Sequence, residues 1–108
     1  MTRRILFAFF AAFLFSFPAR ADAIDGDWCS GDGRMMSIDG PSIRTPSGAQ
    51  ITGEYARHAF RYVGPIGDPE EAHDVRMQLL SEDDLRVDRI IDGTEQPQED
   101  WHRCKPIA

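Results

Sequence analysis

The side chains that could support chemistry in this chain of 108 residues are three histidines, two cysteines and an excess of carboxylates. Histidine is the commonest general base near neutral pH, so His58 or His73 beside a carboxylate would suit a small hydrolase. None of His58, His73 and His102 has a partner at helical i, i+4 spacing, and no nucleophile elbow or phosphate-binding loop accompanies them. We therefore expect a protein that is not an enzyme, with a small hydrolase as the minority hypothesis.

The acidic residues do not form a recognisable metal site in the sequence. Asp25-Gly26-Asp27 lacks the alternating oxygen ligands of a calcium loop. The cysteines lack C-x-x-C spacing, and His102 beside Cys104 matches no known ligand set. The sequence therefore predicts no metal ligand, no catalytic residue and no cofactor.

Cys29 and Cys104 lie near opposite ends of the chain that follows the first 21 residues. In an oxidising compartment two such cysteines are expected to form one structural disulfide. The bond would close a loop of roughly 75 residues, for which chain entropy gives at most about 4 to 5 kcal/mol. A small domain with few aromatic residues needs such a link.

Residues 1–21 have the pattern of a secretory signal peptide. A basic start with Arg3 and Arg4 precedes an apolar run over residues 5–17, and Ala19-Arg20-Ala21 offers the small residues that signal peptidase requires. Cleavage after Ala21 is favoured, and Ala23 offers an alternative. The apolar run is too short to span a bilayer. We expect 1–21 to be removed and 22–108 to form one periplasmic or extracellular domain with no membrane anchor.

Charge excludes several classes of partner. The whole chain has a net charge of −6, and residues 22–108 hold 9 basic against 18 acidic groups, a net of −9. Such a surface argues against nucleic acid and against anionic membranes. Most of the acids follow position 63, in segments that have the composition of loops.

Short apolar or alternating runs are separated by turn signals such as Asp39-Gly40-Pro41 and Asp92-Gly93. The clearest alternation runs over residues 73–79 and repeats over 85–89, which is typical of a half-buried antiparallel hairpin. The fold class predicted is all-β: a small antiparallel meander of about eight short strands that closes into a barrel. The predicted strands are Trp28–Ser30, Arg34–Asp39, Ser42–Thr45, Gln50–Glu54, His58–Val63, His73–Leu80, Leu85–Ile91 and Gln98–Cys104.

The segment from Thr52 to Val63 has two interpretations. Thr52 could cap a helix that ends before Gly64-Pro65. Alternation of Phe60 and Tyr62 favours strands, with Gly53 as a bulge or tight bend.

Trp28 adjoins Cys29, and Trp101 precedes Cys104 by three residues. We expect both indoles to seal one end of the core near the disulfide, with Arg103 stacked on one of them. Gly26-Asp27-Trp28 is a G-x-W motif, and with Arg103 on the last strand it resembles the calycin or lipocalin arrangement, in which a tryptophan packs across the barrel end beside an arginine. That resemblance implies a carrier of small apolar ligands.

The chain also resembles small secreted bacterial proteins of uncharacterised activity. They share Asp27-Trp28-Cys29-Ser30, a Gly-Pro-rich stretch over 38–48, Gly53-Glu54-Tyr55 and a closing Trp101 to Cys104. The likeness covers nearly all of residues 22–108 and implies no activity.

The function expected from these features is a non-catalytic binding or inhibitor-like module that contacts a basic envelope or secreted protein through acidic loops. The alternatives are the calycin-type carrier and a structural envelope protein, and acidic loops also serve solubility. A monomer is expected. The residues predicted to contact the partner are Asp68, Glu70, Glu71, Glu82, Asp83 and Asp84.

Overall fold

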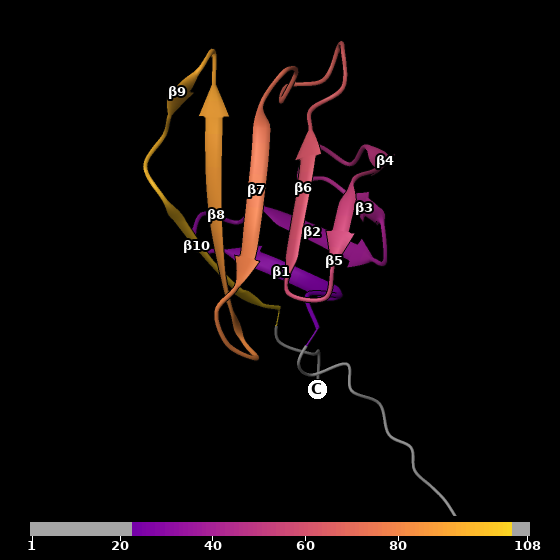
Figure 1. Ribbon diagram of the computed structural model, residues 1–108, viewed down its shortest axis with the longest axis vertical. Coiled ribbons are helices and arrows are strands. Elements are labelled where there is room, and N and C mark those ends of the chain that lie inside the picture. Colours follow the sequence, from indigo (N-terminus) through magenta and orange to yellow (C-terminus); the bar gives the residue numbers. More distant parts are fainter. Residues whose placement is uncertain (1–22, 105–108) are drawn as a thin grey trace, which may run out of the picture.

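Ten short antiparallel strands form one continuous sheet in the computed structural model, which describes residues 23–104 (Figure 1). The expected signal peptide and its cleavage after Ala21 lie outside the described residues. The all-β prediction is confirmed. The strands are β1 (Gly26–Ser30), β2 (Met35–Asp39), β3 (Ser42–Arg44), β4 (Gln50–Thr52), β5 (Glu54–Ala56), β6 (Ala59–Val63), β7 (Asp74–Leu79), β8 (Asp84–Ile91), β9 (Thr94–Glu95) and β10 (Glu99–Arg103).

The sheet is a meander whose first and last strands pair, so it nearly closes on itself. Its order is β4-β3-β2-β1-β10-β8-β7-β6-β5, with β9 also paired to β8. The edge strands β4 and β5 are separated only by Gly53, and β9 and β10 both run along β8, interrupted at residues 96–98. Counting each interrupted pair as one strand gives eight, which agrees with the predicted barrel.

Gly53 is the point where the sheet turns from one edge to the other. A Cβ at this position would lie 2.4 Å from Phe60 Cε1 and 2.6 Å from the Arg61 carbonyl oxygen, so only glycine fits. The Gly53 N–H donates to the Pro41 carbonyl at 2.8 Å. Residues 54–63 are therefore two strands of a hairpin, and the helical alternative for 52–63 is wrong.

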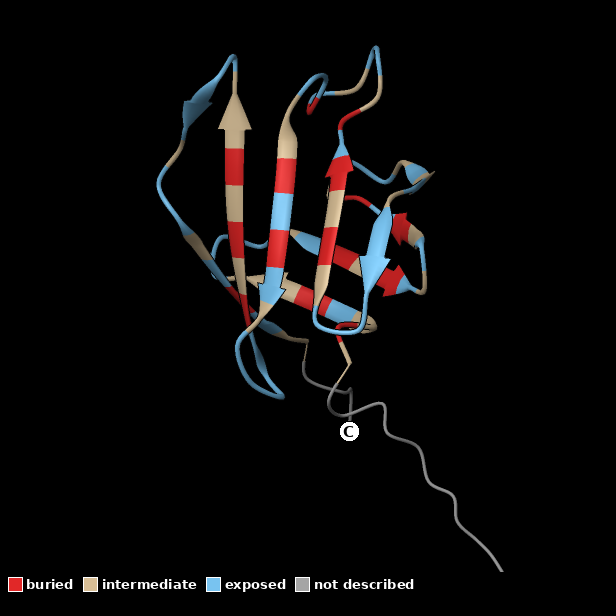
Figure 2. Cartoon of the chain, viewed as in Figure 1, coloured by how far each residue is buried: buried red, intermediate tan, exposed pale blue. Residues whose placement is uncertain are grey.

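The core lies between two layers of this sheet, because β6, β7 and β8 cross over β1 and β2 at a steep angle (Figure 1). Buried residues alternate with exposed ones along β7 and with partly buried ones along β8, as Figure 2 shows. The two-residue alternation seen in the sequence therefore corresponds to the inward and outward faces of the β7–β8 hairpin. The buried apolar residues are Ile24, Trp28, Met36, Ile38, Ile43, Phe60, Tyr62, Val75, Met77, Leu85, Val87 and Trp101.

Successive hairpin loops lie at alternate ends of the barrel because successive strands are antiparallel. We call one end the loop end; it carries the segments 31–34, 45–49, 64–73 and 92–93. The other is the terminal end, with residues 23–25, the loop 80–83 and Cys104. Figure 1 shows the β6–β7 loop and the β8–β9 turn at the top and the β7–β8 loop at the bottom.

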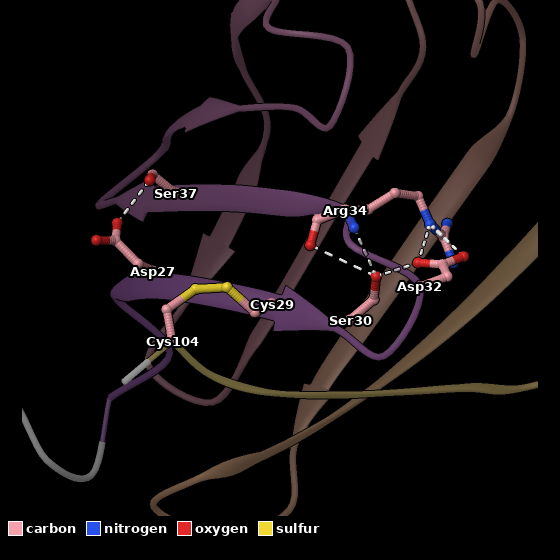
Figure 3. Close-up of a disulfide and its surroundings, with 7 residues drawn as sticks. All are labelled: Asp27, Cys29, Ser30, Asp32, Arg34, Ser37 and Cys104. Atoms are coloured by element: carbon pink, nitrogen blue, oxygen red, sulfur yellow. Dashed lines mark hydrogen bonds and ion pairs between the residues drawn. A yellow bond between two sulfur atoms is a disulfide. The ribbon is translucent and has the colours of Figure 1, made fainter. Parts of the chain in front are cut away.

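The Cys29–Cys104 disulfide is present, with the two Cα atoms 5.1 Å apart, and this prediction is confirmed (Figure 3). It joins β1 to the residue after β10, two strands that already pair. Because Trp28 points into the core, the alternation of β1 places the neighbouring Cys29 on the outer surface of the barrel. The disulfide therefore links β1 to the residue after β10 from the outer side of the barrel, next in sequence to Trp28.

Replacing Cys29 with serine is expected to lower the free energy of unfolding by about 2 to 4 kcal/mol, because the open chain regains loop entropy when it unfolds. Urea unfolding of the variant and of the reduced wild-type protein should give similar midpoints. Thiol titration of the denatured, unreduced wild type should find no free thiol; two free thiols would contradict the bond.

Candidate functional site

The terminal end is closed by Trp28 and Arg103. The Arg103 guanidinium lies over the Trp28 ring, 4.3 Å from its centroid. It also donates hydrogen bonds of 2.7 Å to the carbonyl oxygens of Ala23, Asp25 and Glu82. With its donors directed at backbone, Arg103 holds the first and last described segments and the β7–β8 loop together. These contacts indicate a structural role for Trp28 and Arg103, which is to close the terminal end of the core.

Trp101 serves the opposite end of the core. Its Nε1 donates to Glu99 at 3.0 Å, and the guanidinium of Arg34 lies 5.1 Å from the centre of its ring. The expectation that both indoles seal one end is therefore wrong. Across the β1–β10 pair, Trp28 and Trp101 are not directly opposite each other but two positions apart. Each indole reaches toward a different end of the barrel and stacks with a different arginine.

Arg34 is held over Trp101 by the β1–β2 turn. The Arg34 Nε contacts both carboxylate oxygens of Asp32, at 3.0 and 3.1 Å, and Ser30 Oγ also donates to Asp32 (Figure 3). These hydrogen bonds, that from Arg34 first, lower the pKa of Asp32 to about 2. The Arg34 Nη1 reaches Glu99 at 3.2 Å and so links this turn to β10.

The six acidic residues predicted to contact a partner do not form one surface. Asp68, Glu70 and Glu71 belong to the loop end, whereas residues 82–84 belong to the terminal end. Glu70 is only 8% exposed. Its assignment as a contact residue is wrong, because its carboxylate is used inside the protein.

Glu70 is the centre of a buried charge network at the loop end. Tyr62 Oη donates to its Oε1 at 2.7 Å, and Arg89 Nη1 donates to its Oε2 at 2.5 Å. Arg89 also donates through Nε to Glu99 at 3.2 Å. Arg89 follows Leu85 and Val87 on the inward face of β8, so its side chain is aimed into the barrel. Two carboxylates neutralise and hydrogen-bond it there, as a buried guanidinium requires.

In this network, burial disfavours the charged forms of Arg89 and Glu99, and their ion pairs and hydrogen bonds oppose that effect. Burial would lower the pKa of Arg89, but Glu70 and Glu99 more than reverse this and raise it. Burial likewise works against ionisation of Glu99, yet hydrogen bonds from Trp101 and Arg89 bring its pKa below the ordinary value. The pKa of Tyr62 is raised, mainly by burial and then by its bond to Glu70, so the phenol remains a donor.

A surface pocket of about 360 Å³ opens over this network between the loops 45–49 and 64–73. Its walls include Pro46, Pro69, His73 and Arg89. His73 Nδ1 lies 3.4 Å from Arg89 Nη1, and because a guanidinium has no acceptor atom, the ring nitrogen is the acceptor in this contact. A nitrogen that accepts from a guanidinium is poorly placed to take a proton from a substrate.

The remaining candidate catalytic residues are dispersed. His58 lies in the β5–β6 turn and His102 on β10 pairs with Asp84 at 3.0 Å, both exposed and both away from His73. Within residues 23–104, no three side chains of His, Cys, Asp or Glu gather into a group that could hold a metal ion. The described part of the chain also contains no helix long and apolar enough to cross a membrane.

No protein-family model, curated protein or solved structure matches this chain. Its function must therefore follow from its own side chains, of which the acids at the loop end are the most distinctive. Four of them form no ion pair within 4.0 Å of a Lys, Arg or His nitrogen among residues 23–104, whereas the buried acids Glu70 and Glu99 are paired with Arg89. We call these four the acidic rim: Asp68, Glu71, Asp92 and Glu95.

The acidic rim comes from two neighbouring loops. Asp68 and Glu71 lie on the β6–β7 loop, and Asp92 and Glu95 lie at the β8–β9 turn, where Asp92 and Gly93 both have positive φ, 51° and 76°. β7, which begins after the first loop, pairs with β8, which ends at the second. Although the sequence showed acids at all these positions, only the alternation of the meander decides which of them share an end.

We expect Glu70→Gln to lower the free energy of unfolding by about 3 kcal/mol, because it leaves Arg89 buried with a single carboxylate. Glu71→Gln is the matched control: Glu71 is exposed and its bond from the Gly67 N–H at 2.9 Å survives the change, so the effect should stay within about 0.5 kcal/mol. Chemical denaturation measures both. Equal effects would contradict the role of Glu70.

Stability should also fall in acid. The pKa of Glu99 is lower in the folded protein than its ordinary value of 4.5, so its contribution is complete above that pH and is lost as the pH falls through the folded value. Urea unfolding between about pH 5 and about pH 3 should therefore show a steep loss. Glu99→Gln should show a shallower loss over the same range; an identical slope would contradict the assignment.

Proposed function

We propose that this protein is an exported, non-catalytic binding module that docks through its loop end on a basic protein of the cell envelope or its surroundings. The observation that carries the proposal is the acidic rim: Asp68, Glu71, Asp92 and Glu95 gather at one end without cationic partners among the described residues. Concentrated charge of one sign speeds encounter with a partner of the opposite sign and orients it.

The rigidity of the loop end supports the same role. Asp68 accepts a bond from Ser47 Oγ at 2.6 Å, which ties the β6–β7 loop to the β3–β4 loop. The network of Glu70 and Arg89 fixes the same loop from below. A surface ordered before binding loses little entropy on association, which favours affinity.

A disulfide across the strand seam supports export to an oxidising compartment, periplasmic or extracellular. The domain is expected to act there as a monomer, because its rim would repel a second copy.

A calycin-type carrier is the second candidate. The contact of Arg103 with Trp28 at the closed end and the meander order support that resemblance. Carriage also needs interior space, and large side chains such as Trp101, Phe60 and Met77 pack the described core. Saturable binding of a fluorescent fatty acid, abolished by Met77→Trp, would favour this candidate over docking.

Affinity capture from envelope extract at low salt and again at about 0.5 M salt, where surface charge is screened, tests docking. We expect a basic protein to be recovered mainly at low salt. Neutralising Glu71, Asp92 and Glu95 together should lower its association rate at least about tenfold. Neutralising Asp39, Glu82 and Asp83 at the terminal end is the matched control and should have little effect. Recovery of no protein at either salt would contradict the proposal.

A further inference from the structure

The β6–β7 loop carries the most exposed large apolar side chain in the described part of the protein. Ile66 is 92% exposed, against 54% for Leu80 in the loop at the opposite end. It stands between Pro65 and Gly67 at the tip of the segment 64–73. An isoleucine held in water gains nothing for folding, so its position calls for another explanation.

The loop that carries Ile66 is rigid along its whole length. Backbone bonds join Gly64 to His73 at 2.9 Å and Ala72 to Gly64 at 3.0 Å, which closes the base. Within the tip, Asp68 N–H donates to the Pro65 carbonyl at 3.1 Å, and Glu71 Oε1 accepts from the Gly67 N–H at 2.9 Å. The tip is thus presented in one conformation, unlike an ordinary surface loop.

Two further positions show how tightly the backbone of this loop is constrained, one by steric contact and one by its torsion angle. A Cβ on Gly64 would lie 1.7 Å from the Glu70 carbonyl oxygen, so only glycine allows the base to close. Ala72 adopts a φ of 64°, a left-handed conformation that alanine normally avoids. Glu70, three residues before His73, then anchors the loop to buried Arg89.

The chemistry around Ile66 distinguishes between its possible occupants. Asp68 and Glu71 flank it, and these acids would repel both an anionic lipid surface and the same rim of a second copy. The described chain begins at residue 23, at the opposite end of the barrel, so no neighbouring segment of the described domain is placed to cover it. A protein with a positive surface complements both the acidic side chains of this loop and the uncovered side chain of Ile66.

We propose that Ile66 is the apolar anchor of the docking surface, and that it enters an apolar pocket bordered by lysine or arginine side chains on a protein partner. This inference rests on the proposed function and assigns its central contact. The acidic rim supplies attraction and orientation, whereas Ile66 supplies the buried contact that sets the lifetime of the complex. The rigid loop keeps the entropy cost of that contact low.

Photo-crosslinking in the full chain, produced in a bacterial envelope, tests the inference. Benzoylphenylalanine placed at position 66, 95 or 80 is the probe. We expect position 66 to give one adduct with a basic protein, at a peptide that lies in an apolar pocket beside lysine or arginine. Position 80, at the terminal end, is the control and should give none. Lack of a protein adduct at position 66, or an adduct with lipid or with a second copy, would overturn the inference.

Position 95 separates the two proposals. An adduct from 95 without one from 66 leaves docking by the acidic rim intact and removes Ile66 as its anchor. Failure at both positions removes both proposals.

With the crosslinked protein in hand, Ile66→Ser should weaken its affinity about 10- to 100-fold through faster dissociation, because one buried isoleucine is lost. Ile66→Leu should retain most of the affinity, and Leu80→Ser should be neutral. Near-ultraviolet circular dichroism should be unchanged in all three, since both side chains are exposed. Equal affinity of Ile66→Ser and wild type would overturn the inference.

Discussion

The buried guanidinium of Arg89 is the constraint on which the organisation of the loop end depends. A charge in that position must be matched by carboxylates, and they come from two different places: Glu70 in the β6–β7 loop and Glu99 on β10. Glu99 in turn accepts a hydrogen bond from Trp101 and forms an ion pair with Arg34. One side chain therefore fixes the loop, the last strand and the first hairpin turn relative to each other. An apolar residue on β8 would fill the space but would leave the loop without an anchor.

Each end of the barrel has an arginine stacked on a tryptophan, but the two arginines have different hydrogen-bond and ion-pair partners. At the terminal end, Arg103 stacks on Trp28 and donates hydrogen bonds to backbone carbonyl oxygens. It therefore joins chain segments through the backbone and not through acidic side chains. At the loop end, Arg34 approaches Trp101 and pairs with Asp32 and Glu99. Because Glu70 and Glu99 are paired with Arg89, the acidic rim rather than these interior acids carries the unpaired negative charge of that end.

Much of the fold could be predicted because a few local patterns determine it. Alternation over β7 and β8, glycine turns and two distant cysteines are enough to indicate a disulfide-linked meander. The alternation also contained a signal that was missed: Leu85, Val87 and Arg89 share one parity, which places Arg89 in the core. The partner of Arg89 could not be found in this way, because Glu70 lies in a loop without periodicity. Similarly, the sequence does not reveal that the acids at 68–71 and 82–84 occupy opposite ends, since that depends on strand direction.

The pairing of β1 with β10 places both limits of the described domain at the terminal end, opposite the β6–β7 loop (Figure 1). A tether attached at residue 23 or residue 104 would therefore join the domain at the end opposite the acidic rim. Such a tether would turn the acidic rim outward toward the surrounding medium. The orientation of a sample coupled to a surface through either position would thus be set by the fold itself.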